Sequence, residues 1–150
     1  MDLMESTDNV IRILSVDDHA VLRKGIAALV NSEPDLKLVA EAADGKEAID
    51  AFRCHRPDVT LMDLQMPQVN GIDAIDSIRR EFPEARIVVL TTYSDATQML
   101  RAFKAGARAY ILKAHVHKEL LDTIRAVHAG QKRVPEEISG QTANRTVDER

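Results

Sequence analysis

The sequence predicts an α/β fold in which five parallel strands form a doubly wound sheet covered by five helices. Apolar, strand-like runs alternate with amphipathic helical patterns, with a repeat of about 25 residues per strand–helix unit. Most of these runs are continuously apolar, which is typical of parallel strands buried on both faces. Five units are too few for an eight-stranded barrel, so an open sheet between two helical layers is expected.

The composition fits one globular domain. The chain has 150 residues, of which 45% are hydrophobic and 29% are charged. Its net charge of −4 argues against nucleic-acid binding by this chain itself. Cys54 is the only cysteine, which excludes an internal disulfide and suits a reducing compartment. Without a signal-peptide pattern or a long apolar run, we expect a cytoplasmic protein that does not contact a membrane.

The first half of the chain predicts three strands and two helices. The first helix begins after an acid pair and stops at the Ser-Glu-Pro-Asp cluster of residues 32–35. The second opens on Asp44 with Glu47 three residues later, like a capping box, and ends before Pro57. The expected strands are residues 10–16, 36–42 and 58–63, and the first helix is residues 19–31.

The second half predicts three helices and two strands. A loop over residues 65–71 contains Pro67 and the turn pair Asn70-Gly71, and the helix after it ends before Pro83. Ser94 or Asp95 caps the next helix, which runs to about residue 105 and stops at Gly106. The expected strands are residues 86–91 and 107–113, and the last helix is residues 117–129, ended by Gly130.

Three segments are expected along the chain. Residues 1–9 are polar and acidic and predict a flexible N-terminal tail. Residues 10–130 form the α/β domain. Residues 131–150 are polar, with no periodic apolar face, and predict a linker or tail.

The polar residues at the strand ends predict one shared site. In the strand order 2-1-3-4-5, the first and third strands are neighbours, and ligands bind at the carboxyl edge of such a sheet. Asp17 and Asp18 follow the first strand, Asp63 ends the third, Thr91 ends the fourth and Lys113 ends the fifth. We therefore expect three carboxylates, a hydroxyl and an ammonium group at one edge.

This set of groups suits phosphoryl chemistry. Three adjacent carboxylates stay ionised together only with positive charge among them, and oxygen ligands of this kind suit Mg²⁺. Asp63 could then attack phosphorus as a carboxylate nucleophile. Lys113 and the metal would neutralise the phosphoryl oxygens, and the Thr91 hydroxyl would donate to one of them.

Four stretches of the sequence carry a family resemblance: SVDDH, LMDLQMPQVNG, VVLTT and GARAYILK. Over residues 10–130 the chain resembles the receiver domain of bacterial two-component response regulators, which have a CheY-like, or flavodoxin-like, fold. The run GARAYILKAHVHKELLDTIRAVHAG resembles receivers of the NarL/FixJ (LuxR-type) subfamily. The resemblance implies a signalling domain rather than an enzyme, with only self-phosphorylation from small donors and slow self-dephosphorylation.

The resemblance also assigns the metal site. It implies that Asp63 accepts a phosphoryl group from a sensor histidine kinase with Mg²⁺ as cofactor. Asp17 and Asp18 would hold the metal together with Asp63, Asp18 being the more direct ligand of the pair. Gln65 would contribute its backbone carbonyl.

The resemblance further implies a conformational switch. Thr91 and Lys113 would bind the phosphoryl group, and Tyr110 matches the aromatic residue that turns inward as the hydroxyl residue moves toward phosphate. Many receivers carry proline after the lysine, often with a cis bond; Ala114 stands here instead, which removes that expectation. Gln65 and Tyr93, each two residues past a site residue, are expected to flank the phosphoryl group and to influence its lifetime.

Receivers of this subfamily normally precede a helix-turn-helix domain that binds DNA. Residues 131–150 show no such pattern, so we expect the output domain to be missing from this chain and DNA to be contacted only through it. Phosphorylation is expected to favour a homodimer. The alternatives are a stand-alone receiver and a receiver that acts only through protein contacts.

Other functions fit the residues less well. An aspartyl phosphatase would carry an acid two residues after its nucleophile, where this chain has Gln65. A flavin-binding domain would need a phosphate loop after the first strand, where Asp17 and Asp18 would repel phosphate. His115 and His117 are expected to be helix-entry residues, and His19 a loop residue.

Overall fold

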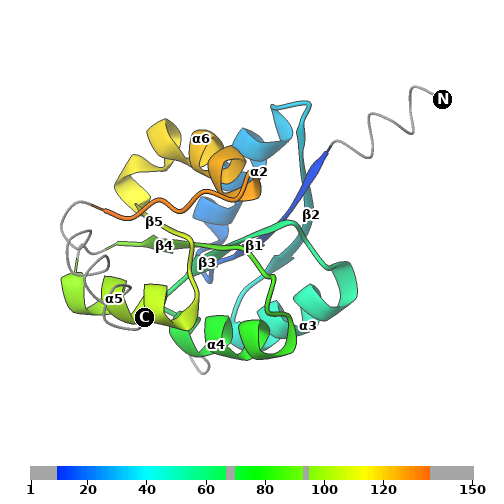
Figure 1. Ribbon diagram of the computed structural model, residues 1–150. Coiled ribbons are helices and arrows are strands. Elements are labelled where there is room, and N and C mark those ends of the chain that lie inside the picture. The colour runs from blue at the N-terminus through cyan, green and yellow to red at the C-terminus, as the bar shows by residue number, and fades with distance from the viewer. Residues whose placement is uncertain (1–9, 67–69, 93–94, 136–150) are drawn as a thin grey trace.

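Figure 1 shows the computed structural model, which describes residues 10–66, 70–92 and 95–135. The predicted tail of residues 1–9 and residues 136–150 of the predicted linker lie outside the described part. Pro67, Tyr93 and Ser94, which the sequence analysis singled out, also lie outside it.

The five described strands form one parallel sheet in the order β2-β1-β3-β4-β5, as predicted. The three central strands are buried almost completely because helices cover both faces of the sheet. The strand bounds are β1 Ile11–Val16, β2 Leu36–Ala42, β3 Val59–Asp63, β4 Ile87–Thr91 and β5 Ala109–Leu112.

The described helices lie in two layers. Helices α2 and α6 cover one face of the sheet, and α3, α4 and α5 cover the other (Figure 1). Each layer has its own apolar core, and the sheet separates the two cores. The bounds are α2 Ala20–Asn31, α3 Gly45–His55, α4 Gly71–Glu81, α5 Ala96–Ala105 and α6 Val116–His128.

The predicted helix caps of α3 and α5 are confirmed. The Asp44 side chain accepts a hydrogen bond from the Glu47 backbone N–H at 2.8 Å, and Asp95 accepts from Thr97 N–H at 2.9 Å. Gly106 ends α5 with a φ of 119°, a left-handed conformation that favours glycine. These local interactions fix where the helices start and stop, and therefore how the strands between them align.

The predicted Asn70-Gly71 turn is wrong. Asn70 is the N-cap of α4, and its side chain accepts from the Asp73 N–H at 2.9 Å. Gly71 is the first helical residue and packs directly against the end of β3. A Cβ atom at residue 71 would collide with the Asp63 carbonyl oxygen and lie 2.6 Å from the Leu64 Cα. Glycine therefore lets α4 approach the end of the central strand.

The end of β5 also differs from the prediction. The strand ends at Leu112, and Lys113 is the first residue of the 3₁₀ turn η1, Lys113–His115, which leads into α6. The change is small, because Lys113 still leaves the sheet at its carboxyl edge beside the other strand ends.

Residues 131–135 lie along the outer side of β5. The Arg133 N–H donates to the Arg108 carbonyl at 2.8 Å, and Arg133 forms an isolated parallel bridge with Ala109. Val134 packs against the core under α5. This segment therefore shields part of an edge strand. Whether it belongs to the domain or to a linker stays a prediction.

In the described part of the chain, no helix combines the length and apolar character needed to cross a membrane.

Candidate functional site

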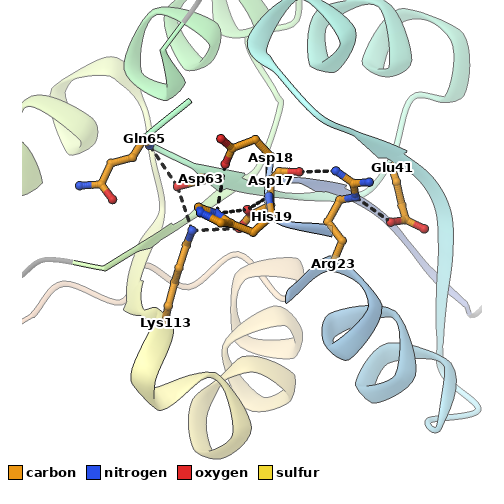
Figure 2. Close-up of polar contacts among 8 residues, drawn as sticks. All are labelled: Asp17, Asp18, His19, Arg23, Glu41, Asp63, Gln65 and Lys113. Atoms are coloured by element: carbon orange, nitrogen blue, oxygen red, sulfur yellow. Dashed lines mark hydrogen bonds and ion pairs between the residues drawn. The ribbon is translucent and has the colours of Figure 1, made fainter. Parts of the chain in front are cut away.

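The predicted site residues from three strand ends meet at the carboxyl edge of the sheet (Figure 2). Asp63 is the last residue of β3, Asp17 directly follows β1, and Lys113 directly follows β5. Because β1 and β3 are adjacent, the Asp17 and Asp63 side chains converge on the same spot. The Lys113 ammonium group reaches them across the end of β4.

Asp63 is completely buried at the centre of this site. Its Oδ1 accepts a hydrogen bond from the Gln65 N–H at 3.0 Å and lies 3.3 Å from Lys113 Nζ. Its Oδ2 is also buried and has no hydrogen-bond partner among the described residues. A buried carboxylate oxygen without a partner is energetically unfavourable, so such an atom is a candidate for ligand contact.

The environment of Asp63 raises its pKa to about 6. Burial is the largest cause, because removal from water disfavours the charged form. The Gln65 N–H opposes this increase, the nearby negative charge of Asp17 adds to it, and Lys113 lowers it again. The ionised form of Asp63 is therefore destabilised in the folded protein, and an added positive charge nearby would stabilise it.

Lys113 joins the two buried acids. Its Nζ lies 3.0 Å from Asp17 Oδ2 and 3.3 Å from Asp63 Oδ1, and its side chain is only 13% exposed. One ammonium group thus balances one of the two buried charges. The remaining negative charge is the feature that a cation would match.

The acid pair after β1 has one buried member and one exposed member. Asp17 is buried, whereas Asp18 lies at the rim. The Arg23 guanidinium donates to the Asp17 carbonyl at 2.6 Å and also pairs with Glu41, which fastens this loop to α2 and β2. The backbone of Asp17 is therefore held in place independently of its carboxylate.

His19 belongs to the same cluster, which the sequence analysis missed. Its Nδ1 lies 3.0 Å from Asp17 Oδ1 and 3.1 Å from Asp18 Oδ1 (Figure 2). The order Asp-Asp-His was visible in the sequence. The direction of the ring was not, because it depends on how the chain turns into α2.

The described residues fit a divalent cation. Ligand atoms of Asp17, Asp18, His19 and Asp63 all lie within 4.8 Å of one another. The carboxylate oxygens are hard donors, and Asp63 Oδ2 is buried without a hydrogen-bond partner among the described residues. Gln65 is half-buried beside Asp63 and contacts it through its N–H group.

Thr91 and Tyr110 form a second, adjacent pair. Thr91 is fully buried at the end of β4, and Tyr110 is only 7% exposed on β5. Burial raises the pKa of the Tyr110 phenol, whereas a hydrogen bond with Thr91 lowers it. The Tyr110 hydroxyl also lies 3.5 Å from Gln98 Oε1 of α5. The hydroxyl residue of the site is thus linked to the aromatic residue on the next strand.

An open parallel sheet binds its ligands at the carboxyl edge, which is where this chain places its acids and its lysine. The response regulator receiver domain family matches residues 13–125 of the chain. The chain therefore belongs to the response regulator receiver family.

Individual relatives define the subfamily. The chain is 37% identical to the transcriptional regulatory protein LiaR of Bacillus subtilis over 136 residues, which cover 91% of this chain and 64% of LiaR. Its sequence is also 37% identical to that of a LuxR-family two-component response regulator from Aurantimonas sp. SI85-9A1, whose crystal structure is known. That match has a TM-score of 0.82 and covers 92% of this chain and 99% of the other. The chain is a receiver domain of the LuxR (NarL/FixJ) type.

A third relative was solved with a phosphate mimic. The isolated receiver domain of RcsB from Salmonella enterica serovar Typhimurium, in the presence of the phosphomimetic BeF₃⁻, is 26% identical with a TM-score of 0.78. The match covers 87% of this chain and 97% of that domain. The chain spans less than two thirds of the length of curated relatives such as LiaR.

Proposed function

We propose that Asp63 accepts a phosphoryl group from a phosphohistidine of a sensor histidine kinase. The observation that carries this proposal is the buried Asp63 Oδ2, which has no hydrogen-bond partner among the described residues and lies at the ligand-binding edge of the sheet. Asp17, 0% exposed, and Lys113, 13% exposed, supply the charges around it. Family membership supports the same role.

Phosphoryl transfer needs in-line placement and charge neutralisation more than it needs acid–base chemistry. An Asp63 oxygen forms a bond to phosphorus while the phosphorus–nitrogen bond of the donor breaks and its electron pair returns to the imidazole. With a pKa of about 6, Asp63 is mostly ionised at neutral pH and is a competent nucleophile. Lys113, 3.3 Å from Asp63 Oδ1, stabilises negative charge on the transferred group.

We propose Mg²⁺ as the cofactor, held by Asp17, Asp18 and Asp63 with the Gln65 backbone carbonyl as a further ligand. The chemistry that a bound Mg²⁺ supplies is neutralisation of the acids and of the phosphoryl oxygens. The donor set supports this assignment because carboxylate and carbonyl oxygens suit hard cations. Lys113 already pairs with Asp17 and Asp63, so the metal completes the charge balance rather than creating it.

Thr91 and Tyr110 are proposed to convert phosphorylation into a change of surface. A phosphoryl group on Asp63 offers new acceptor oxygens to the Thr91 hydroxyl. A shift of Thr91 would alter its hydrogen bond to Tyr110, and Tyr110 lines a hollow of about 410 Å³ between β5, α5 and α6. Residues of this hollow, including Met99, Thr123 and Val134, would repack with it.

In the whole protein, we propose that this surface controls a homodimer and, through a helix-turn-helix domain, transcription in the cytoplasm. The supporting facts are the LuxR-type relatives and the description of LiaR as a transcriptional regulator. DNA contacts are assigned to the output domain, because this chain carries a net charge of −4.

Intact-mass spectrometry after incubation with acetyl phosphate and Mg²⁺ tests the proposal. The wild type should gain about 80 Da, the mass of one added phosphoryl group in place of a proton. Asp63→Ala should gain nothing, and Asp76→Ala, which removes an acid from the exposed side of α4, should behave like the wild type. Modification of Asp63→Ala to the wild-type extent would refute the assignment.

A further inference from the structure

The His19 imidazole lies among the proposed metal ligands. Its Nδ1 is within hydrogen-bonding distance of Oδ1 of both Asp17 and Asp18, at 3.0 and 3.1 Å (Figure 2). The ring is 64% exposed, so it is accessible from solvent and can turn without disturbing the core. A nitrogen donor thus stands beside an otherwise all-oxygen ligand set.

A nitrogen donor changes which metals a site prefers. Mg²⁺ is held by oxygen ligands, whereas imidazole suits Zn²⁺ and other first-row transition metals. These metals also bind carboxylates, so Asp17 and Asp18 can serve either class. The His19 Nδ1 faces both acids and donates its N–H to them. A cation between the acids would take the lone pair of Nδ1 once the ring proton is carried by Nε2 instead, because a neutral imidazole exists in either tautomer.

The Asp63 carboxylate provides an independent second observation. One carboxylate oxygen of Asp63 belongs to the same group of ligand atoms within 4.8 Å, and the Asp63 Oδ2 atom is fully buried without a hydrogen-bond partner among the described residues. A bound cation would satisfy this oxygen. The cluster is thus more than a set of exposed acids.

We propose that this site also binds borderline divalent cations, Zn²⁺ in particular, with His19 Nδ1 as a nitrogen ligand beside the carboxylates of Asp17 and Asp18. Such an ion competes with Mg²⁺ for the same acids, so the two metals exclude each other. The inference rests on the metal-binding part of the proposed function. It does not depend on Asp63 being the phosphoacceptor.

The His19 side chain can be replaced without loss of the interactions that hold Asp17 in place. The His19 backbone N–H donates to Asp17 Oδ1 at 2.7 Å, and this bond does not involve the ring. Arg23 holds the Asp17 carbonyl from α2. In a His19→Gln variant, Asp17 therefore keeps its position while the imidazole nitrogen is lost. His117→Gln is the matched control, because His117 is exposed and lies outside the cluster.

The experiment is calorimetric titration of the metal-free protein with Zn²⁺ and, separately, with Mg²⁺, for the wild type and both variants. We expect His19→Gln to weaken Zn²⁺ binding at least about tenfold and to change Mg²⁺ affinity less than about twofold. His117→Gln should leave both unchanged. In ¹⁵N-histidine NMR spectra of the wild type, Zn²⁺ should shift the Nδ1 resonance of His19, and excess Mg²⁺ should reverse the shift.

Equal Zn²⁺ affinity of the wild type and His19→Gln would overturn the inference, as would a Zn²⁺ shift confined to other histidines. These outcomes leave the proposed function intact if Mg²⁺ still binds. Failure of the wild type to bind Mg²⁺ would instead contradict the metal-binding part of the proposed function. The two failures are therefore distinguishable.

Discussion

Asp63→Asn is expected to stabilise the metal-free domain at neutral pH. The site raises the pKa of Asp63 from 3.8 to about 6. A shift of about two units corresponds to a cost of about 3 kcal/mol for keeping this carboxylate ionised in the folded protein. Asparagine has a similar shape without the charge, so the free energy of unfolding should rise by about 1 to 3 kcal/mol.

The Asp63→Asn substitution should leave the neighbouring charged and polar groups with partners. Lys113 keeps Asp17 Oδ2 as an ion-pair partner at 3.0 Å, so no uncompensated ammonium group is created. The oxygen of the introduced side-chain amide can still accept a hydrogen bond from the Gln65 N–H. The repulsion between Asp17 and Asp63 also disappears.

The pH dependence provides the more specific test. Because the folded-state pKa of Asp63 lies above its unfolded-state value, this group destabilises the wild type progressively as pH rises from about 4 to about 6. Below about pH 4 the carboxyl group is protonated in both states and the difference between the two proteins should vanish. Above about pH 7 the difference should reach its plateau.

Urea denaturation in EDTA, from pH 4 to pH 8, measures this difference directly. Asp76→Asn is the control, since Asp76 is 48% exposed on α4 and its substitution should change stability little at any pH. Added Mg²⁺ should stabilise the wild type more than Asp63→Asn, and so reduce the difference in free energy of unfolding between the two proteins. An Asp63→Asn variant that is no more stable than the wild type at pH 7.5, or a gap that does not change with pH, would refute the reasoning.

Three further predictions concern neighbouring residues. Gly71→Ala should lower the free energy of unfolding by about 1 to 3 kcal/mol in urea denaturation, because the added Cβ meets the backbone at the end of β3. An unchanged urea midpoint of unfolding would contradict the close approach of α4 to the end of β3. Lys113→Met should raise the pKa of Asp63 above about 6 in metal-free protein, because the Lys113 ammonium group lowers this pKa. ¹³C NMR of the Asp63 carboxyl group would measure the change, and a lowered pKa would count against the ion pair between Lys113 and Asp63. Tyr110→Phe should lower the free energy of unfolding by about 1 kcal/mol through loss of the hydrogen bond to Thr91, and Tyr110→Ala by about 3 to 5 kcal/mol through loss of buried ring contacts. In thermal denaturation, no loss for Tyr110→Phe would argue against the hydrogen bond, and equal losses for both variants would argue against the ring contacts.

The fold was accessible from the sequence because its signals are local. Continuous apolar runs predicted buried parallel strands, and Asp44 and Asp95 marked helix starts that the structure confirms. The convergence of Asp17, Asp63 and Lys113 followed from the strand order, because residues that end neighbouring parallel strands must share an edge.

Other features depend on contacts between distant segments and could not be predicted locally. Asn-Gly is a common turn pair, so the N-cap role of Asn70 became apparent only from the packing of α4 on β3. The His19 ring joins the acids because of the path from β1 into α2. Residues 131–135 lack a periodic apolar pattern, and their position beside β5 depends on the backbone hydrogen bond from Arg133 to Arg108 and on the bridge between Arg133 and Ala109.

Chemical trapping of the phosphorylated residue tests the central claim most directly. Borohydride reduces an aspartyl phosphate to homoserine but leaves free carboxylates and other phosphorylated side chains intact. After treatment with acetyl phosphate and Mg²⁺, then borohydride, peptide mass spectrometry should find homoserine in place of Asp63. Homoserine at another aspartate, or phosphorylated protein with unmodified Asp63, would contradict the account.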